Sequence, residues 1–423
     1  MIFFPTIFPD ELLYSAFARY HRNSGNESIR QTMKELFDNS STCSSVWFPS
    51  QLDHLTRQIP GQRYSSDELI QKHTLIPYFT PFIPPMRAER LVETMKFSTC
   101  SPANMILGRA ALSVKPKQKL MYCTGCVSED RAKYGEAYWH RCHQLEGVYL
   151  CPMHGELLWQ SNISHQMQKN RFQYITLEKA LVDNGELIST EFLGGEFSRN
   201  IATQSLSLLE KQFPSEGLHS INRYYVSRLR SEGYVCNASS RIRWDRLIQG
   251  FNSFYGEKLL ATINGVISES DSWLHKLLRK PRVSCHPLRH ILLLGFLGES
   301  VEGMMNSLSR GTMTTFEPFG HGPWPCLNKA ASHYKQPMIG SVKITRGSKT
   351  GKPVGTFKCN CGFVYSRTGP DDKESDRYQI GRVKEFGIVW KNRLVELSSQ
   401  QLSLRKKADM LGCDPQTVLN YQE

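Results

Sequence analysis

Cys123-Thr124-Gly125-Cys126 and, further along the chain, Cys151-Pro152-Met153-His154 are the stretches that decide how this region folds. Each has two metal-binding side chains separated by two residues, so that one tight turn can direct both toward a single ion. Together the turns supply three thiolates and one imidazole, which complete the tetrahedron that zinc prefers. The sequence therefore predicts a closed, structural zinc site held by Cys123, Cys126, Cys151 and His154. We expect Gly125 to give the first turn its conformational freedom.

Three rival ligands, His140, Cys142 and His143, lie between these two turns. We assign all three a structural role behind the zinc ligands. Because the site leaves no coordination position open, it favours structure over catalysis.

A second cysteine pair, Cys359-Asn360-Cys361, lies between two strand-like flanks near the end of the chain. Cys326 and His333 precede it. We predict a second structural zinc ion held by Cys326, His333, Cys359 and Cys361. The spacing from Cys326 to His333 is loose, and the Cys-x-Cys pair is tighter than the usual zinc turn.

Length and charge restrict the class of protein. The chain has 423 residues, with 52 Lys and Arg against 39 Asp and Glu, for a formal net charge of +13. The length suggests about two to four domains. The charge favours a polyanionic partner, most commonly nucleic acid, and the alternative is a merely soluble basic protein.

The sequence also indicates a cellular compartment. Its N-terminus lacks the basic and apolar regions of a signal peptide, and its longest apolar run, Ile291–Leu297, is too short to span a bilayer. We therefore expect a cytoplasmic protein, in which disulfides are rare and clustered cysteines indicate metal sites.

Helical periodicity dominates the rest of the chain. We expect Asp10 to N-cap a first helix, Ser24-Gly25-Asn26 to end it, and a second helix to follow, either as a helix-turn-helix or as a plain helical hairpin. Trp244, Leu247, Ile248, Phe251 and Phe254 predict a central helix, and the segment from Arg382 onward is expected to be helical.

The end of the chain predicts a helix-turn-helix. Ser403 can cap one helix, Gly412 can end it, and Asp414-Pro415 can start the next, with Val418 and Leu419 facing inward. A recognition helix presents its first residues to base edges, while the preceding helix contacts phosphates. The predicted DNA contacts are Arg405, Lys406 and Lys407 to phosphates, and Gln416, Thr417 and Asn420 to bases. The alternative is an ordinary two-helix cap with solvated lysines.

These patterns predict a mainly α multidomain fold with helix-turn-helix units and two small zinc-binding modules of the zinc-finger or ribbon type. The expected domains are an N-terminal helical, helix-turn-helix-like part at 1–120, a first zinc module at 121–160, a central helical domain at 161–320, a second zinc module at 321–370 and a C-terminal helix-turn-helix segment at 371–423.

The motifs resemble a known family. Pro9–Ser15, the first zinc ligands, Tyr138-Trp139 and His143–Val148 resemble the TniQ domain, while Gly322–Asn328 and Gly351–Phe363 are similar to the longer TnsD members. One departure is that Ala331 and Ser332 stand where a cysteine is often found, which leaves the fourth ligand of the second site open. Because TnsD members commonly continue further, we expect a truncated or a short member.

The resemblance implies a non-enzymatic, double-stranded DNA-binding target selector for transposition in bacteria. Such proteins bind an attachment site, which for TnsD lies at the end of the glucosamine-fructose-6-phosphate synthetase gene. They recruit the AAA+ regulator TnsC and, through it, the transposase. Shorter TniQ relatives instead link a CRISPR RNA-guided effector complex to transposition, and this adaptor role is the alternative.

An enzyme is the rival from another class. The chain has no Gly-x-Ser-x-Gly elbow and no His-Glu-x-x-His motif. A metal-dependent DNA-cleaving enzyme with scattered carboxylates is the enzymatic alternative, since such carboxylates need not be adjacent in sequence.

Overall fold

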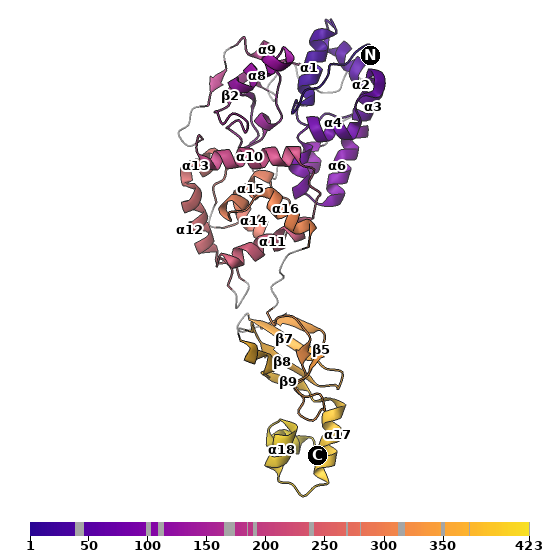
Figure 1. Cartoon of the computed structure of the whole chain (residues 1–423), viewed down its shortest axis with the longest axis vertical. Coiled ribbons are helices and arrows are strands. Elements are labelled where there is room, and N and C mark those ends of the chain that lie inside the picture. The colour runs from indigo at the N-terminus through magenta and orange to yellow at the C-terminus, as the bar shows by residue number, and fades with distance from the viewer. Residues whose placement is uncertain are drawn as a thin grey trace. The chain divides into compact units, whose positions relative to one another are not determined.

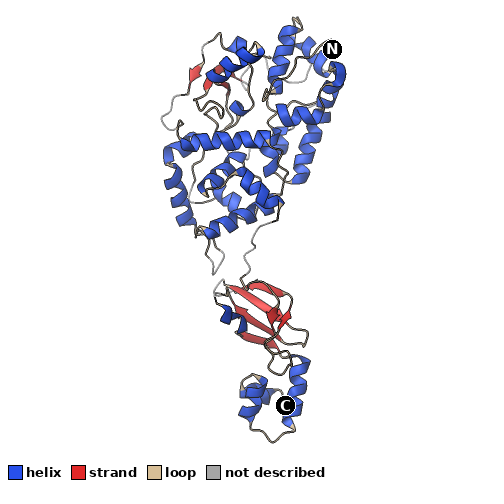
Figure 2. Ribbon diagram, viewed as in Figure 1, coloured by secondary structure: helices blue, strands red, loops and turns tan. Residues whose placement is uncertain are grey.

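The chain folds as two compact units, each considered by itself. Unit 1 is Met1–Leu229 with Trp244–Met313, and unit 2 is Arg230–Arg243 with Thr314–Glu423. The computed structural model describes residues 1–38, 46–98, 103–108, 114–164, 174–183, 185–188, 193–236, 241–267, 270–279, 281–311, 318–347, 352–371 and 373–422. Within these ranges the fold is mainly helical, as the sequence predicts (Figure 2). Every helix in these ranges is too short or too polar to cross a bilayer.

Most of unit 1 is built from short helices (Figure 1). In chain order the α-helices are α1 (Leu13–Asn23), α2 (Ile29–Phe37), α3 (Leu52–Gln58), α4 (Ser66–His73), α5 (Ile76–Phe79), α6 (Pro85–Phe97), α7 (Ala103–Leu107), α8 (Thr124–Tyr134), α9 (Leu177–Ala180), α10 (Glu196–Glu210), α11 (Leu218–Ser231), α12 (Trp244–Tyr255), α13 (Glu257–Thr262), α14 (Trp273–Leu278), α15 (Pro287–Phe296) and α16 (Val301–Ser309). The 3₁₀ turns among the described residues of this unit are η1 (Pro60–Gln62), η2 (Thr80–Phe82) and η4 (Cys142–Gln144).

The first helix pair forms as expected, but it starts differently. α1 begins at Leu13 with Leu12 as its N-cap, and Gly25 turns the chain toward α2 with a left-handed φ of 68°. Asp10 does not cap α1. Its carboxylate accepts instead from Arg141 Nε at 3.0 Å and from the Cys142 backbone N–H at 3.1 Å. Asp10 lies two residues before the N-cap Leu12 in a left-handed conformation (φ 54°), and the Arg141 guanidinium holds its carboxylate there through a charge-assisted bond.

The centre of unit 1 is α15, which packs against α10. Leu288 and the run Ile291–Leu294 are fully buried, and the polar Arg289 and His290 of the same helix are buried with them. His286 caps this helix by accepting from the Leu288 N–H at 3.2 Å. The neighbouring α12 buries Leu247 and Phe251 at their predicted positions, whereas Phe254 is 40% exposed.

A small antiparallel sheet completes unit 1. Its strands, in the order β1-β2-β3, are β1 (Lys119–Tyr122), β2 (Trp159–Ser164) and β3 (Glu186–Leu187). α8 follows β1 directly, and Cys123 is the N-cap of that helix. The first predicted ligand turn therefore joins β1 to α8, and the second is flanked by the isolated bridge between Leu150 and Leu157.

The described part of unit 2 contains two antiparallel sheets and three α-helices. One sheet pairs β4 (Trp324–Pro325) with β5 (Pro337–Ile339). The other has the order β6-β7-β8-β9, with β6 (Val342–Arg346), β7 (Pro353–Lys358), β8 (Val364–Thr368) and β9 (Arg382–Glu385). Its core surrounds Phe319, Trp324, Phe357 and Tyr365. A 3₁₀ turn, η5 (Glu374–Tyr378), lies between β8 and β9.

The prediction that the chain is helical from Arg382 onward is wrong at its start. Residues Arg382–Glu385 form β9, which pairs with β8 through Ser366↔Arg382 and Tyr365↔Val383. Its alternation places Val383 against the core and its charged neighbours outward. This strand is stabilised by its long-range pairing with β8. It carries a single apolar residue, which is too weak a pattern to predict a strand from the sequence.

The last three helices close around one tryptophan. They are α17 (Gly387–Ser398), α18 (Leu404–Leu411) and α19 (Pro415–Asn420). Trp390 is fully buried, and its Nε1 donates to the Leu411 carbonyl at 3.0 Å, which joins α17 to the end of α18. The local predictions here are confirmed: Ser403 caps α18, Gly412 is left-handed at φ 68°, and Asp414 caps α19. Leu419 is a correction, because it is 42% exposed while Val418 is buried.

Candidate metal centres and DNA-contact residues

The first cluster combines two turns that are separate in sequence. Cys123 directly follows β1 as the N-cap of α8, and Cys126 lies in the first turn of that helix. Cys151 and His154 come from a tight turn that is closed by the Gly155 N–H donating to the Cys151 carbonyl at 2.8 Å. The four ligand atoms lie within 4.8 Å of one another and could hold a metal ion.

The dimensions of this cluster match a tetrahedral zinc site. His154 Nδ1 lies 3.6, 3.4 and 3.5 Å from the Sγ atoms of Cys123, Cys126 and Cys151. The Cys126 and Cys151 Sγ atoms are 3.6 Å apart. Zinc bonds of about 2.3 Å to sulfur and about 2.0 Å to nitrogen give tetrahedral edges of roughly 3.8 and 3.5 Å. A disulfide would need about 2.05 Å, and these cysteines are free thiols.

The His154 ring is positioned by a contact with Glu129 and by the space that Gly125 leaves. Glu129 Oε1 lies 3.3 Å from Nε2, so a carboxylate faces the ring nitrogen opposite the sulfurs. Carboxylates at this position orient a metal-binding imidazole. Gly125 does not have a positive φ, so conformational freedom is not its role here. A Cβ at residue 125 would instead lie 2.7 Å from the imidazole, so glycine leaves room for the ligand.

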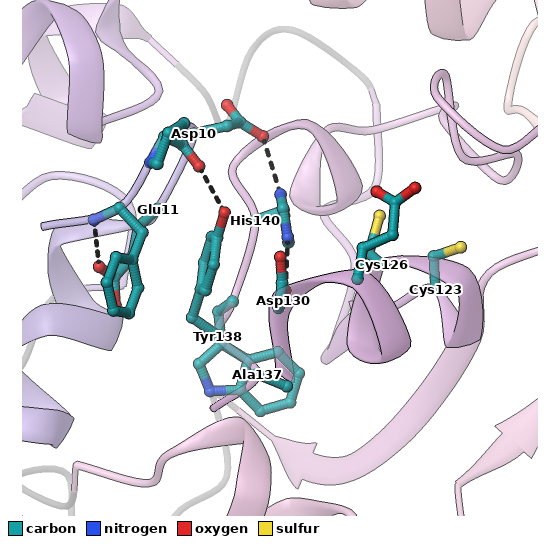
Figure 3. A network of polar contacts seen from close by, with 12 residues as sticks. Asp10, Glu11, Cys123, Cys126, Asp130, Ala137, Tyr138 and His140 are labelled. Carbon is teal, nitrogen blue, oxygen red and sulfur yellow. Dashed lines mark hydrogen bonds and ion pairs between the residues drawn. The ribbon is translucent and has the colours of Figure 1, made fainter. Parts of the chain in front are cut away.

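His140 belongs to a buried ionic network beside this cluster (Figure 3). Its Nε2 lies 2.9 Å from Asp130 Oδ2, and its Nδ1 lies 3.7 Å from Asp10 Oδ2. Burial alone would lower the pKa of His140, but the two carboxylates outweigh it and raise that pKa to about 9. Although burial opposes the charge on Asp10, His140 and Arg141 hold its pKa well below the usual range. The network therefore fixes a charged imidazole between the N-terminal segment and α8.

Asp10, His140 and Cys142 form a further group with metal-ligand spacing. The two Asp10 oxygens already accept from Arg141 Nε and from the Cys142 N–H. A guanidinium so close supplies the positive charge that a metal ion would bring. We therefore assign this group to the ionic network.

The third rival, His143, lies behind the cluster. Its Nε2 is 3.8 Å from Cys126 Sγ, and its carbonyl accepts from the buried Lys117 Nζ at 2.7 Å. Lys117 also donates to the Val148 carbonyl. Burial lowers the pKa of Lys117 to about 7. These backbone contacts connect the segment between the two ligand turns to the strand that precedes them.

The second cluster also comes together. Cys326 follows β4, whereas Cys359 and Cys361 come from the turn between β7 and β8. The Cys326 and Cys361 Sγ atoms are 3.8 Å apart, and Cys359 Sγ is 3.4 Å from His333 Nε2. With His333 as the fourth member, the ligand atoms lie within 4.8 Å of one another and could hold a metal ion. The Asn328 side chain, which the sequence patterns did not single out, donates to Cys361 Sγ at 3.6 Å.

The predicted DNA-contact residues lie on the hairpin of α18 and α19. On α18, Arg405 and Lys406 are exposed and Lys407 is half-buried. On α19, Gln416 and Asn420 are exposed, Thr417 is half-buried, and Gln416 Nε2 donates to Asn420 Oδ1 at 3.1 Å. The hairpin has the geometry of two short helices joined by a left-handed glycine.

Comparison with known proteins gives two family matches and one relative. The family model of Tn7-like transposition protein D matches residues 201–423, and that of TniQ matches residues 2–158. The Escherichia coli protein "Transposon Tn7 transposition protein TnsD" is 26% identical over 297 residues, which is 69% of this chain and 56% of that protein. The chain thus spans about half the length of the curated relative that it matches. Since the first of these models covers more than half of its residues, the chain belongs to the family of Tn7-like transposition protein D.

Proposed function

We propose that this protein is a non-enzymatic selector of target sites for DNA transposition, which binds a specific duplex site and recruits an AAA+ regulator of the TnsC type. The observation that carries this proposal is the match of residues 201–423 to Tn7-like transposition protein D together with that of residues 2–158 to TniQ. The net charge of +13 supports a polyanionic ligand. The transposase is an indirect partner, and the protein acts on chromosomal DNA in the bacterial cytoplasm.

Both metal clusters are proposed to hold structural zinc. In the first, Cys123, Cys126, Cys151 and His154 complete a tetrahedron and leave no position for substrate. In the second, Cys326, His333, Cys359 and Cys361 do the same, with Asn328 donating to a thiolate. The ions would fix turns that join otherwise short elements, so their contribution is to folding.

The hairpin of α18 and α19 is proposed to read the DNA. Its N-capped second helix points a polar first turn outward, which is how a recognition helix presents side chains to a major groove. Gln416, Thr417 and Asn420 would contact base edges, while Arg405, Lys406 and Lys407 would contact phosphates. The end of the glucosamine-fructose-6-phosphate synthetase gene is the proposed site.

The experiment that tests this proposal lets the protein choose its own DNA. Fragmented bacterial chromosomal DNA is incubated with the purified chain, and the retained fragments are sequenced. We expect one enriched site, and we expect the AAA+ regulator to be retained on that fragment only when the chain is present. Retention of all fragments alike would overturn the proposal. Retention only after addition of a CRISPR effector complex would favour the adaptor role, and cleaved fragments in the presence of a divalent metal would favour an enzyme.

A further inference from the structure

The sheet of β6, β7, β8 and β9 has two chemically different faces. On the inner face, Phe357 and Tyr365 are cross-strand partners whose rings stack at 4.9 Å. Arg367 lies on the same face, over the Phe357 ring at 4.4 Å, and it is neutralised by Asp371 at 2.6 Å. Because side chains alternate along a strand, the residues between these point to the opposite side of the sheet.

The outer face carries a row of cations and hydroxyls. The register aligns Lys343, Thr356, Ser366 and Arg382 across the four strands. Lys384 is on the same face, because its Nζ donates to Thr356 Oγ1 at 2.9 Å. Lys358, two residues beyond Thr356 on β7, shares that face by alternation.

These cations have little local counter-charge. Lys343, Lys358, Arg382 and Lys384 are all exposed, and none forms an ion pair with a carboxylate in the described part of the chain. Glu385, at the end of β9, is the one acidic residue within the four strands. A row of four positions spans three strand spacings, or roughly 14 Å. That length is comparable to the width of the DNA major groove, about 12 Å, so the cations can reach phosphates on both sides of a groove.

The composition of the face selects among polyanions. Proteins that hold single strands stack bases on aromatic side chains, but the aromatic residues of this sheet are on its inner face. Protein interfaces depend on buried aromatic or arginine anchors in pockets, and this face offers three lysines and one exposed arginine instead. Lysine and threonine contacts to phosphate carry no base preference.

We propose that the outer face of this sheet binds the phosphate backbone of duplex DNA through Lys343, Lys358, Arg382 and Lys384. This surface is additional to the hairpin of α18 and α19. The inference rests on the proposed function only because it takes duplex DNA as the ligand. It holds the DNA without regard to sequence, while the hairpin reads bases.

The test is the salt dependence of binding to a random-sequence duplex. The full chain is compared with the quadruple variant Lys343→Gln, Lys358→Gln, Arg382→Gln and Lys384→Gln. Each lost phosphate contact should reduce the slope of log affinity against log salt by about 0.9, so the quadruple change should reduce it by up to about 3.6. A matched control removes four exposed cations from unit 1 by Lys34→Gln, Arg57→Gln, Lys72→Gln and Lys133→Gln, and it should leave the slope nearly unchanged.

The outcomes separate this inference from the proposed function. If the slope is unchanged in the quadruple variant, or falls equally in the control, the sheet is not a DNA-binding surface. This holds even if the wild type prefers one DNA site. If the slope falls in the quadruple variant but the wild type prefers no DNA site, the proposed function as a site selector is wrong, while the sheet remains a DNA-binding surface. If the quadruple variant lost binding to duplex RNA or single-stranded DNA but kept its binding to duplex DNA, the sheet would not be a surface for duplex DNA. Should the quadruple variant fail to fold, Lys343→Gln and Lys358→Gln alone should each lower the slope by about 0.9.

Discussion

Gly125 is a residue whose importance lies in the space it leaves. A methyl group there would lie 2.7 Å from the His154 imidazole, so the ring or the turn must shift. We expect Gly125→Ala to weaken metal binding by about 10- to 100-fold, the range seen when the orientation of a ligand is disturbed. Competition with a chelator measures this. Gly194→Ala is the matched control, because nothing lies within 4 Å of its added Cβ. Equal affinity of the two variants would contradict the close contact.

His140 gives the fold a pH dependence of known sign. Its pKa is raised from 6.5 to about 9, so its stabilising charge is fully present below about pH 6.5 and is lost as the pH rises through 9. A shift of this size corresponds to roughly 3 kcal/mol of unfolding free energy. Urea titrations of the wild type and of His140→Gln at several pH values should converge as the pH rises. A constant difference in unfolding free energy between pH 6 and pH 9.5 would show that the charge of His140 is not what stabilises the network.

The clustering of the predicted ligand residues could be foreseen from sequence, but the residues that support them could not. The spacing of Cys123 to Cys126 and of Cys151 to His154 is local, and a local turn suffices to bring each pair together. Glu129 and Asp130 reach their imidazoles only because α8 follows the cysteine turn in this geometry. Asp10 was expected to cap a helix, because the sequence does not reveal that Arg141 lies beside it.

At the scale of elements, the helix ends were the most predictable feature. Ser403, Gly412 and Asp414 act within one turn of their own positions, and all three act as predicted. β9 was missed, because its hydrogen bonds go to a strand more than ten residues earlier. Cooperative long-range pairing of this kind leaves little trace in a short window.

In the proposed function, base reading depends on α19. The triple change Gln416→Ala, Thr417→Ala and Asn420→Ala should weaken binding to the cognate duplex by a few kcal/mol, at about 1–3 kcal/mol for each lost base contact. It should barely alter binding to random duplex. The matched control changes three exposed polar residues outside this hairpin, by Asn392→Ala, Gln400→Ala and Gln401→Ala. If the triple variant bound cognate DNA like the control, α19 would be a structural cap.

At the scale of the whole molecule, the two clusters predict a metal stoichiometry. The first lies in unit 1 and the second in unit 2, so each unit carries its own four ligands. Elemental analysis of the purified chain should therefore find two zinc ions. The change Cys123→Ser should leave one ion and unfold part of unit 1, because a structural zinc contributes on the order of 10 kcal/mol. A single zinc ion in the wild type would show that one of the two clusters does not bind metal. Two ions in either the Cys123→Ser or the Cys359→Ser variant would show that an ion binds outside the changed cluster.

The central claim is that this chain distinguishes one duplex site from all others. The most direct measurement is a competition titration of the purified protein between the end of the glucosamine-fructose-6-phosphate synthetase gene and a scrambled duplex of the same composition, at physiological salt. We predict that the cognate site binds at least about 10³-fold more tightly, which is the lower end for specific DNA-binding proteins. Equal affinity for the two duplexes, at this salt and at lower salt, would contradict the account.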